Sequence, residues 1–249
     1  MDIDFNKELI IAKKAALEAG NFLKKNKNNL NRTISSTDRD IKLQADIEVE
    51  KIIKDIINND SSFGILAEES GMSSEKSYEN LWIVDPLDGT ANYSRNIPLC
   101  CVSIAILSDA KPVLGVIYDF NNDDLYEGSI NKSACLNGKE ISVSKTKTSQ
   151  EGVLVTGLPN DTDYSDEAMM DMIKNFQNWR KVRMIGSAAL ASAYIASGKA
   201  DLYMENKSYL WDIAAGAAIV NAAGGEALIL NQNEKFQVDV RFSNSLVKS

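Results

Sequence analysis

The 249-residue sequence contains no histidine, and this absence removes several kinds of active site from consideration. Ser-His-Asp and Cys-His hydrolysis, phosphohistidine chemistry and histidine-ligated metal sites all require an imidazole ring. Catalysis by this chain would therefore depend on carboxylates, hydroxyls, lysine or a metal ion held by oxygen atoms.

Cysteine, basic clusters and long apolar runs are also scarce. The three cysteines (Cys100, Cys101 and Cys135) form neither a disulfide framework nor a zinc-ligand spacing, so we expect them to be reduced. The net charge is −8 and no dense basic block occurs, which argues against a nucleic-acid partner. No apolar run approaches the ~20 residues of a membrane span, and the first residues lack the pattern of a secretion signal. These absences predict a cytoplasmic protein with no membrane partner.

Hydrophobic periodicity predicts two helices near the start of the chain. Apolar residues recur at helical spacing over residues 6–25 and again over residues 45–58. The polar residues 26–40 between them predict a loop or a mobile hairpin. A short buried strand is predicted over residues 63–67, followed by a polar loop over residues 72–80.

Strands dominate the middle of the chain, and strands and helices alternate after residue 150. Predicted strands lie at residues 99–107, 112–119, 124–128, Val153–Thr156, 182–185, 201–204 and 227–230. Predicted helices lie at residues 165–177, 187–197 and 210–223. This order is typical of an α/β layered protein. We expect one domain over residues 1–249, with intimate subdomains at about 1–149 and 150–249.

Residues 81–90, Leu-Trp-Ile-Val-Asp-Pro-Leu-Asp-Gly-Thr, carry the most chemical information. A short apolar strand over residues 81–84 delivers Asp85 and Asp88 to its carboxyl end. Pro86 blocks helix and disfavours the helical conformation at the residue before it, so an extended, tight turn holds the two carboxylates.

Gly89 and Thr90 follow directly, and their backbone amides could face an anion if a helix begins there. Two hard oxygen ligands beside an anion site suit a Mg²⁺-dependent phosphate enzyme. The alternative is an ordinary surface turn, because Asp-Pro and Asp-Gly are common turn dipeptides.

Further acidic residues stand where predicted elements begin or end. Glu68 and Glu69 follow an apolar strand, where they form either part of a site or a solvated turn. Asp46 and Asp212 each stand at the start of a helix, where capping the helix is the alternative to a catalytic role. The helix after Asp212 is almost wholly small and apolar, so a carboxylate there needs a cation or a hydrogen-bond partner.

Three motifs in this order resemble the inositol monophosphatase family, part of the lithium-sensitive, Mg²⁺-dependent sugar-phosphatase superfamily. They are Glu68-Glu69-Ser70, residues 82–92 and Trp211-Asp212-Ile213-Ala214-Ala215-Gly216. Asp46 and Glu50 match the family's upstream acidic element, although Lys42-Leu43 stands where Val-Thr is usual. The resemblance implies the superfamily's layered α-β-α-β-α sandwich.

The resemblance also implies two to three Mg²⁺ ions and inhibition by Li⁺. The first ion would be held by Glu68, Asp85 and the backbone carbonyl of Leu87. The second would be held by Asp85, Asp88 and Asp212, with Asp85 bridging the two ions. A third, weaker ion is implied near Glu68.

Phosphate and water positions are implied in the same way. The Gly89 and Thr90 amides would hold the phosphate, and the Thr90 hydroxyl, paired with Asp46, would help to position the attacking water. Asp46, Glu68 and Thr90 are thus the implied catalytic residues, whereas Glu69 would support the metal site without direct ligation. Clustered Mg²⁺ ions neutralise a phosphate dianion and acidify water, so direct hydrolysis needs no histidine.

The substrate contacts depend on a later segment. Glu205 precedes Asp212 by seven residues, which is the family spacing of a glutamate that contacts inositol hydroxyls. A surface acid after a strand is the alternative reading of Glu205. Gly186 and Ser187 are similar to an element that lines the family's pocket.

The implied function is hydrolysis of inositol monophosphate or a related small polyol phosphate. Alternatives within the superfamily are a 3′-phosphoadenosine 5′-phosphate phosphatase, a fructose-1,6-bisphosphatase and a histidinol-phosphatase. An alternative of another class is a regulatory or scaffold protein on the same fold. Relatives are commonly dimers, so a homodimer is expected. Met169, Met170 and Met172 are interpreted as core residues of their helix.

Overall fold

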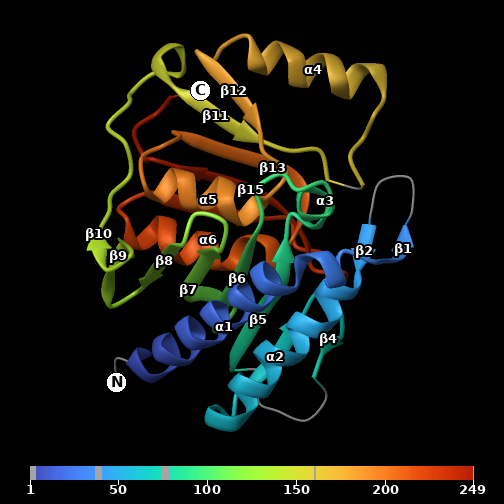
Figure 1. Cartoon of the computed structure of the whole chain (residues 1–249). Helices are drawn as coiled ribbons and strands as arrows, with labels where there is room; N and C mark the ends of the chain where they lie inside the picture. The colour runs from blue at the N-terminus through green and yellow to red at the C-terminus, as the bar shows by residue number, and fades with distance from the viewer. Residues whose placement is uncertain (1–3, 37–40, 74–78, 160, 249) are drawn as a thin grey trace.

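Helical layers and β-sheets alternate through the described chain, in a computed structural model that covers residues 4–36, 41–73, 79–159 and 161–248 (Figure 1). Helices α1 and α2 cover one face of an eight-stranded sheet, and α5 and α6 cover its other face. A five-stranded sheet packs on the far side of α5 and α6, with α4 outside it. The predicted α-β-α-β-α layering is confirmed.

The first helical layer consists of α1 (Asn6–Leu30) and α2 (Gln44–Asp60). Helix α1 runs five residues past its predicted end, so the first part of the predicted 26–40 loop is wrong. The reason is Leu30, which continues the apolar stripe of the helix and is buried. Residues 37–40 of that predicted loop lie outside the described residues.

A short hairpin joins the two helices. Strands β1 (Thr33–Ser36) and β2 (Ile41–Leu43) pair in antiparallel orientation, as the hairpin alternative for this segment predicted. Leu43 is buried and leads directly into α2. The hairpin therefore stands beside the start of α2.

The eight-stranded sheet has the order β10-β9-β8-β7-β6-β5-β3-β4. Its strands are β3 (Gly64–Ala67), β4 (Gly71–Met72), β5 (Asn80–Asp88), β6 (Cys101–Ser108), β7 (Lys111–Asp119), β8 (Asp124–Ser129), β9 (Lys132–Leu136) and β10 (Lys139–Glu140). The short strands β4, β9 and β10 were not predicted, because they lie at or next to a sheet edge and carry little apolar alternation. Of the predicted 72–80 loop, residues 74–78 lie outside the described residues.

Between the sheets lie α5 (Ala188–Ala196) and α6 (Leu210–Ala222). Both helices are apolar around nearly their whole circumference because each faces protein on all sides. Gly216 of α6 lies so close to Ser192 of α5 that a methyl group at Gly216 would overlap the Ser192 side chain. Small residues therefore set the separation of the two helices.

The five-stranded sheet has the order β12-β11-β13-β15-β14. Its strands are β11 (Val153–Thr156), β12 (Lys181–Met184), β13 (Leu202–Tyr209), β14 (Glu226–Leu230) and β15 (Gln237–Ser243), and the short helix η1 (Ser149–Glu151) precedes it. Strand β15 was not predicted, although Val238, Val240 and Phe242 alternate inward along it. All strands of the larger sheet precede residue 150, and all strands of this sheet follow it. The proposed division into subdomains stays a prediction.

Helix α4 (Asp166–Phe176) lies on the outer face of the smaller sheet (Figure 1). None of its residues is buried, and 52% of Met170 is exposed. The prediction that its methionines fill the core is wrong for Met170, and it is wrong for Met169 and Met172 because these two line a cavity.

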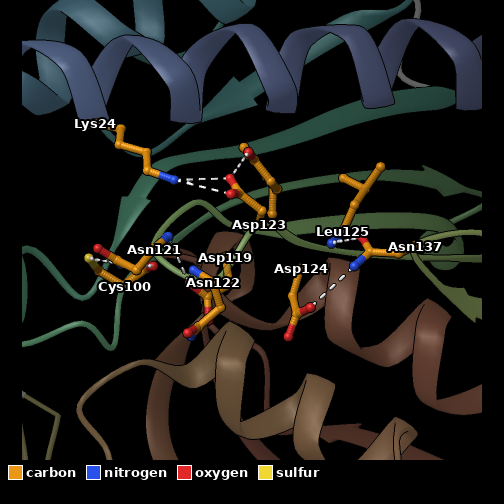
Figure 2. A network of polar contacts seen from close by, with 10 residues as sticks. Lys24, Cys100, Asp119, Asn121, Asn122, Asp123, Asp124, Leu125 and Asn137 are labelled. Carbon is orange, nitrogen blue, oxygen red and sulfur yellow. Dashed lines mark hydrogen bonds and ion pairs between the residues drawn. The ribbon is translucent and has the colours of Figure 1, made fainter.

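The turn between β7 and β8 links α1 to the sheet (Figure 2). Asp119 is buried and accepts hydrogen bonds from the amides of Asn121 and Asn122 at 3.0 and 3.2 Å. Lys24 of α1 pairs with Asp123 at 3.1 Å. The Asn121 side chain donates to the carbonyl of Cys100 at 3.4 Å, so the turn also supports the segment before β6.

Two predicted absences concern the whole chain. Among the described residues, no helix is both long and apolar enough to cross a membrane. The three cysteines are free thiols, as predicted.

We predict that Gly216→Ala destabilises the protein through its contact with Ser192. Inserting a methyl group into a packed helix interface costs about 1–3 kcal/mol. The cost should be smaller in a Ser192→Gly background, which makes room for the added methyl. Urea unfolding of wild type, both single variants and the double variant measures this coupling. Equal costs in the two backgrounds would contradict the proposed contact.

Candidate active site

The site begins at the carboxyl ends of two parallel strands, β3 and β5. Glu68 follows β3 directly, and its amide donates to the carbonyl of Val84 at 3.1 Å. The predicted strand over 81–84 is too short, because β5 continues to Asp88. The Glu68 backbone and the acidic end of β5 are therefore adjacent.

An irregularity in β5 brings Asp85 and Asp88 to the same side. Asp85 pairs with Ser103 and Asp88 with Cys101, so β5 carries one residue more than β6 between these pairs. Residues three apart point to opposite faces of a regular strand, and an extra residue reverses that alternation. Both carboxylates line one cavity. The Leu87 amide donates to Asp85 Oδ1 at 2.9 Å and tightens the bulge.

The chain leaves β5 through Gly89 and enters the short helix α3 (Thr90–Ser94). Gly89 has φ = 89°, a conformation that glycine adopts without strain, and a Cβ there would lie 2.7 Å from the carbonyl of Leu99. The helix starts at Thr90, as the phosphate-site prediction required. The first amides of a helix have no intrahelical acceptor, so they are available to an anion.

Helix α2 presents one acid to this turn and another to the segment after β3. Asp46 accepts from the Thr90 hydroxyl at 3.1 Å and from the Leu43 amide at 2.6 Å. Asp46 is the third residue of α2 and bonds back to the residue before the helix, so it combines a capping contact with a place in the site. Glu50, one turn later, accepts from the Glu69 amide at 2.8 Å.

Glu69 forms an ion pair with Lys42, and both side chains line the cavity. The sequence reasoning noted Lys42 only as a departure from a familiar motif. Lys42 stands just before the acidic start of α2, and this position was the feature of the sequence that could have suggested its ion pair with Glu69. Glu68 is exposed, in contrast to the half-buried Glu69.

The starts of α5 and α6 close the site from the other side. Ser187 caps α5 by accepting from the Leu190 amide at 3.2 Å, and its hydroxyl donates to Asp88. The Ala189 amide donates to the same carboxylate at 2.9 Å. Asp212, the third residue of α6, accepts from the Tyr209 amide at 3.1 Å.

Together these residues surround a cavity of about 550 Å³. It is lined by every residue named for the site by sequence reasoning: Asp46, Glu68, Glu69, Asp85, Leu87, Asp88, Gly89, Thr90, Gly186, Ser187, Glu205 and Asp212. The cavity also contains Leu158, Pro159, Tyr209 and Trp211, which sequence reasoning missed. The rings of Tyr209 and Trp211 stack with centroids 4.7 Å apart. Their closeness to Asp212 in the sequence could have suggested that they line the cavity.

Burial and mutual repulsion dominate the electrostatics of the cavity. Burial, followed by the charges of Glu68 and Asp88, raises the pKa of Asp85 well above its ordinary value. Burial also raises the pKa of Asp88, against the lowering effect of its bond from Ser187. Burial and the charge of Glu68 raise the pKa of Asp212 well above its ordinary value. The carboxylates therefore resist carrying their charges together.

Burial also raises the pKa values of two further acids that line the cavity, Asp46 and Glu205. Burial raises the pKa of Asp46 to about 6, in spite of its bonds from Leu43 and Thr90. Burial raises the pKa of Glu205 to about 7. The Ser208 hydroxyl donates to Glu205 at 2.8 Å, and the carboxyl faces the cavity, so the surface alternative for Glu205 is wrong. Gly186 has φ = 68° and stands beside Asn92, whose amide donates to the Ile185 carbonyl at 2.7 Å.

Within the described ranges, no group of three or more Asp, Glu, Cys or His side chains is already arranged to enclose a metal ion. Asp88 shows why: its oxygens accept from Ser187 and from the amides of Ala188 and Ala189. Its carboxylate is thus stabilised by neutral donors from the protein.

Comparisons with known proteins show which family this chain resembles along nearly its whole length. A sequence profile described as the inositol monophosphatase family matches residues 5–248. Inositol monophosphatase 1 of Bos taurus is 32% identical over 211 residues, which cover 81% of this chain and 76% of that protein. The Nus factor SuhB of Xylella fastidiosa is 36% identical over 216 residues, which cover 85% of this chain and 78% of that protein.

Solved structures show the same architecture. The inositol monophosphatase of Anabaena aligns with a TM-score of 0.83 at 32% identity, covering 97% of this chain and 92% of that chain. The extragenic suppressor protein suhB of Bartonella henselae aligns with a TM-score of 0.84 at 32% identity, covering 94% and 93%.

We predict that Glu205 makes the protein less stable as pH rises. The folded state holds the Glu205 proton up to about pH 7, well above the ordinary value of a glutamate, so it binds more protons than the unfolded state at mildly acidic pH. The free energy of unfolding should therefore fall as pH rises through about 7. Urea unfolding in EDTA at pH 5.5 and pH 8 measures this fall.

The fall should be smaller in Glu205→Gln and unchanged in Glu140→Gln, an exposed matched control. An equal fall in Glu205→Gln and wild type would show that Glu205 is not its source.

Proposed function

Because the chain belongs to the inositol monophosphatase family, we propose that it is a Mg²⁺-dependent phosphomonoesterase that hydrolyses inositol monophosphate or a related small polyol phosphate. The observation that carries this proposal is the convergence of Asp85, Asp88 and Asp212 on one cavity beside the Gly89-Thr90 turn. Clustered carboxylates and a backbone anion site are what a metal-assisted phosphatase requires.

The donor set fits magnesium. Its atoms are hard oxygens. Burial raises the pKa values of Asp85, Asp88 and Asp212, and neighbouring negative charges raise those of Asp85 and Asp212 further, so bound cations would stabilise the ionised carboxylates. We propose that Glu68, Asp85 and the Leu87 carbonyl hold one ion, and that Asp85, Asp88 and Asp212 hold another, with a third near Glu68. Bound there, Mg²⁺ would neutralise phosphate charge and acidify a water molecule.

The chain itself would position the phosphate and the water. The amides of Gly89 and Thr90 would bind phosphate oxygens. The Thr90 hydroxyl lies 3.1 Å from Asp46 Oδ1 and 3.0 Å from the Leu87 carbonyl, to either of which it can donate, so its oxygen remains available to accept a hydrogen bond from a proton of the attacking water. We propose that Glu68, which faces the cavity, assists in removing that proton. Glu69, held by Lys42, would support Glu68 without ligation.

The alcohol part of the substrate would lie against Glu205, Gly186 and Ser187. A buried acid that accepts hydrogen bonds suits neutral hydroxyl groups. Among the described residues that line the cavity, Lys42 is the cationic one, and Glu69 already neutralises it. A second substrate phosphate would find little compensation there, which favours a monophosphate over 3′-phosphoadenosine 5′-phosphate or fructose 1,6-bisphosphate.

Phosphate release from four substrates tests the proposal. Inositol 1-phosphate, 3′-phosphoadenosine 5′-phosphate, fructose 1,6-bisphosphate and histidinol phosphate would each be assayed with Mg²⁺, with EDTA and with added Li⁺. We expect the fastest release from inositol 1-phosphate, loss of activity in EDTA and inhibition by Li⁺. A folded, Mg²⁺-supplied sample that hydrolyses none of them would overturn the proposed activity.

We predict that Asp85→Asn lowers kcat/KM at least about 100-fold, because it removes the charge shared by the two proposed ions. Calorimetric titration with Mg²⁺ should show weaker binding as well. Asp55→Asn, the same change at an exposed aspartate of α2 outside the cavity, is the matched control. Wild-type Mg²⁺ affinity in Asp85→Asn would contradict the assignment.

A regulatory or scaffold role is a second candidate, because relatives named Nus factor SuhB are as similar to this chain as relatives named inositol monophosphatase. The Asp88→Asn variant distinguishes the phosphatase proposal from the scaffold proposal. It should abolish hydrolysis, whereas a function that depends only on the fold should remain. A homodimer, a cytoplasmic location and the absence of a nucleic-acid partner stay predictions.

A further inference from the structure

A second cavity of about 420 Å³ lies next to the proposed active site. It is bounded by α4 on one side and by the end of β11 and the middle of β13 on the other. Its apolar lining consists of Leu158, Pro159, Met169, Met172, Phe176 and Met204. We call this space the methionine chamber.

The methionine chamber and the active-site cavity share a wall. Gly157, Leu158, Pro159 and Glu205 line both spaces. A Cβ at Gly157 would overlap the Glu205 carboxylate, so the absence of a side chain at Gly157 allows Glu205 to occupy this position. A molecule that contacts Glu205 in the active site therefore stands at the edge of the chamber.

Helix α4 covers its apolar side chains only in part. Protein interiors are close-packed, and an amphipathic helix ordinarily buries its apolar side. Helix α4 buries no residue, although Met169, Met172 and Phe176 face the chamber and are partly covered. Asn175 holds the helix by donating to Met204 Sδ at 3.3 Å. Apolar atoms placed in this space would complete the contact between α4 and the sheet.

We propose that the methionine chamber is a subsite for an apolar or aromatic arm of the substrate's leaving group. This inference rests on the proposed phosphatase function and narrows its substrate class. Thioether side chains are flexible and polarisable and make favourable contacts with aromatic rings. The volume falls within the ~300–1,000 Å³ typical of small-molecule pockets. Because chain elements wall the space on opposite sides, it suits a small arm and not a folded partner.

The geometry orders the parts of such a substrate. The phosphate lies at the Gly89-Thr90 turn, a hydroxyl or ester oxygen lies near Glu205, and the arm passes Leu158 and Pro159 into the methionine chamber. A compact polyol would use only the first two positions. A phosphate monoester with an aryl or alkyl extension would use all three and gain affinity from burying that extension.

Hydrolysis of a graded series tests this subsite: ethyl, 2-phenylethyl and 4-phenylbutyl phosphate, each with Mg²⁺. Wild type should prefer one of the phenyl esters over ethyl phosphate about 10-fold or more in kcat/KM. Met172→Trp, which fills the chamber, should lower kcat/KM for that phenyl ester about 10-fold and leave ethyl phosphate unchanged. Met170→Trp is the matched control, because Met170 is on the exposed side of α4, and it should change neither value.

Calorimetry measures the binding of the matching phosphonates in the presence of Mg²⁺. This measurement tests the chamber independently of the proposed phosphatase activity. If no ester is hydrolysed but 4-phenylbutylphosphonate binds wild type about 10-fold more tightly than Met172→Trp, the chamber stands and the phosphatase proposal fails. Equal preference for phenyl and ethyl compounds in wild type, in both hydrolysis and binding, would overturn the chamber. So would an equal loss in Met172→Trp and Met170→Trp. Circular dichroism and thermal unfolding confirm that both variants are folded.

Discussion

Mutual repulsion among buried carboxylates is the constraint around which the rest of the structure is arranged. Asp85, Asp88 and Asp212 share one cavity, where burial raises the pKa values of all three and neighbouring negative charges raise those of Asp85 and Asp212 further. Assembling such groups destabilises the folded chain unless donors or cations compensate. The protein supplies part of this compensation, because the Ser187 hydroxyl and several backbone amides donate to the carboxylates. Metal ions would supply the remainder, so the strength of the metal site and the stability of the fold are linked.

Each supporting element positions a group that lines this cavity. The bulge in β5 aligns Asp85 with Asp88, and the close contact of α5 with α6 sets the starts of both helices against the sheet. On the opposite side, α2 presents Asp46 to the Thr90 hydroxyl. The turn between β7 and β8 supports Cys100, against which Gly89 is packed (Figure 2). Distant contacts thereby fix a turn of a few residues.

Local patterns were sufficient to predict a layered α/β protein with acidic residues at the ends of its elements, and the resemblance to a family supplied the order of the layers and the other residues of the candidate site. Asp85 and Asp88 follow an apolar strand, and Asp212 opens an apolar helix. The bulge was not predictable, because it depends on the register of β5 against β6. The Ser187–Asp88 bond joins residues 99 positions apart, and only the resemblance to a family suggested that they meet.

The α4 methionines show the limit of composition as a guide. An apolar side chain on an amphipathic helix indicates a covered face, but not what covers it. In the structure Met169 and Met172 face an open space whose wall includes Glu205. Carboxylates that would hold metal ions and amides that would hold phosphate serve any phosphate ester, so they cannot select among substrates by themselves. Selection must come from surfaces that touch the leaving group, and those surfaces lie on both sides of Glu205. On the proposed assignments, the chemistry and the specificity of this protein would therefore reside in separate elements: the sheet edge with its helix starts, and α4 with the segment before it.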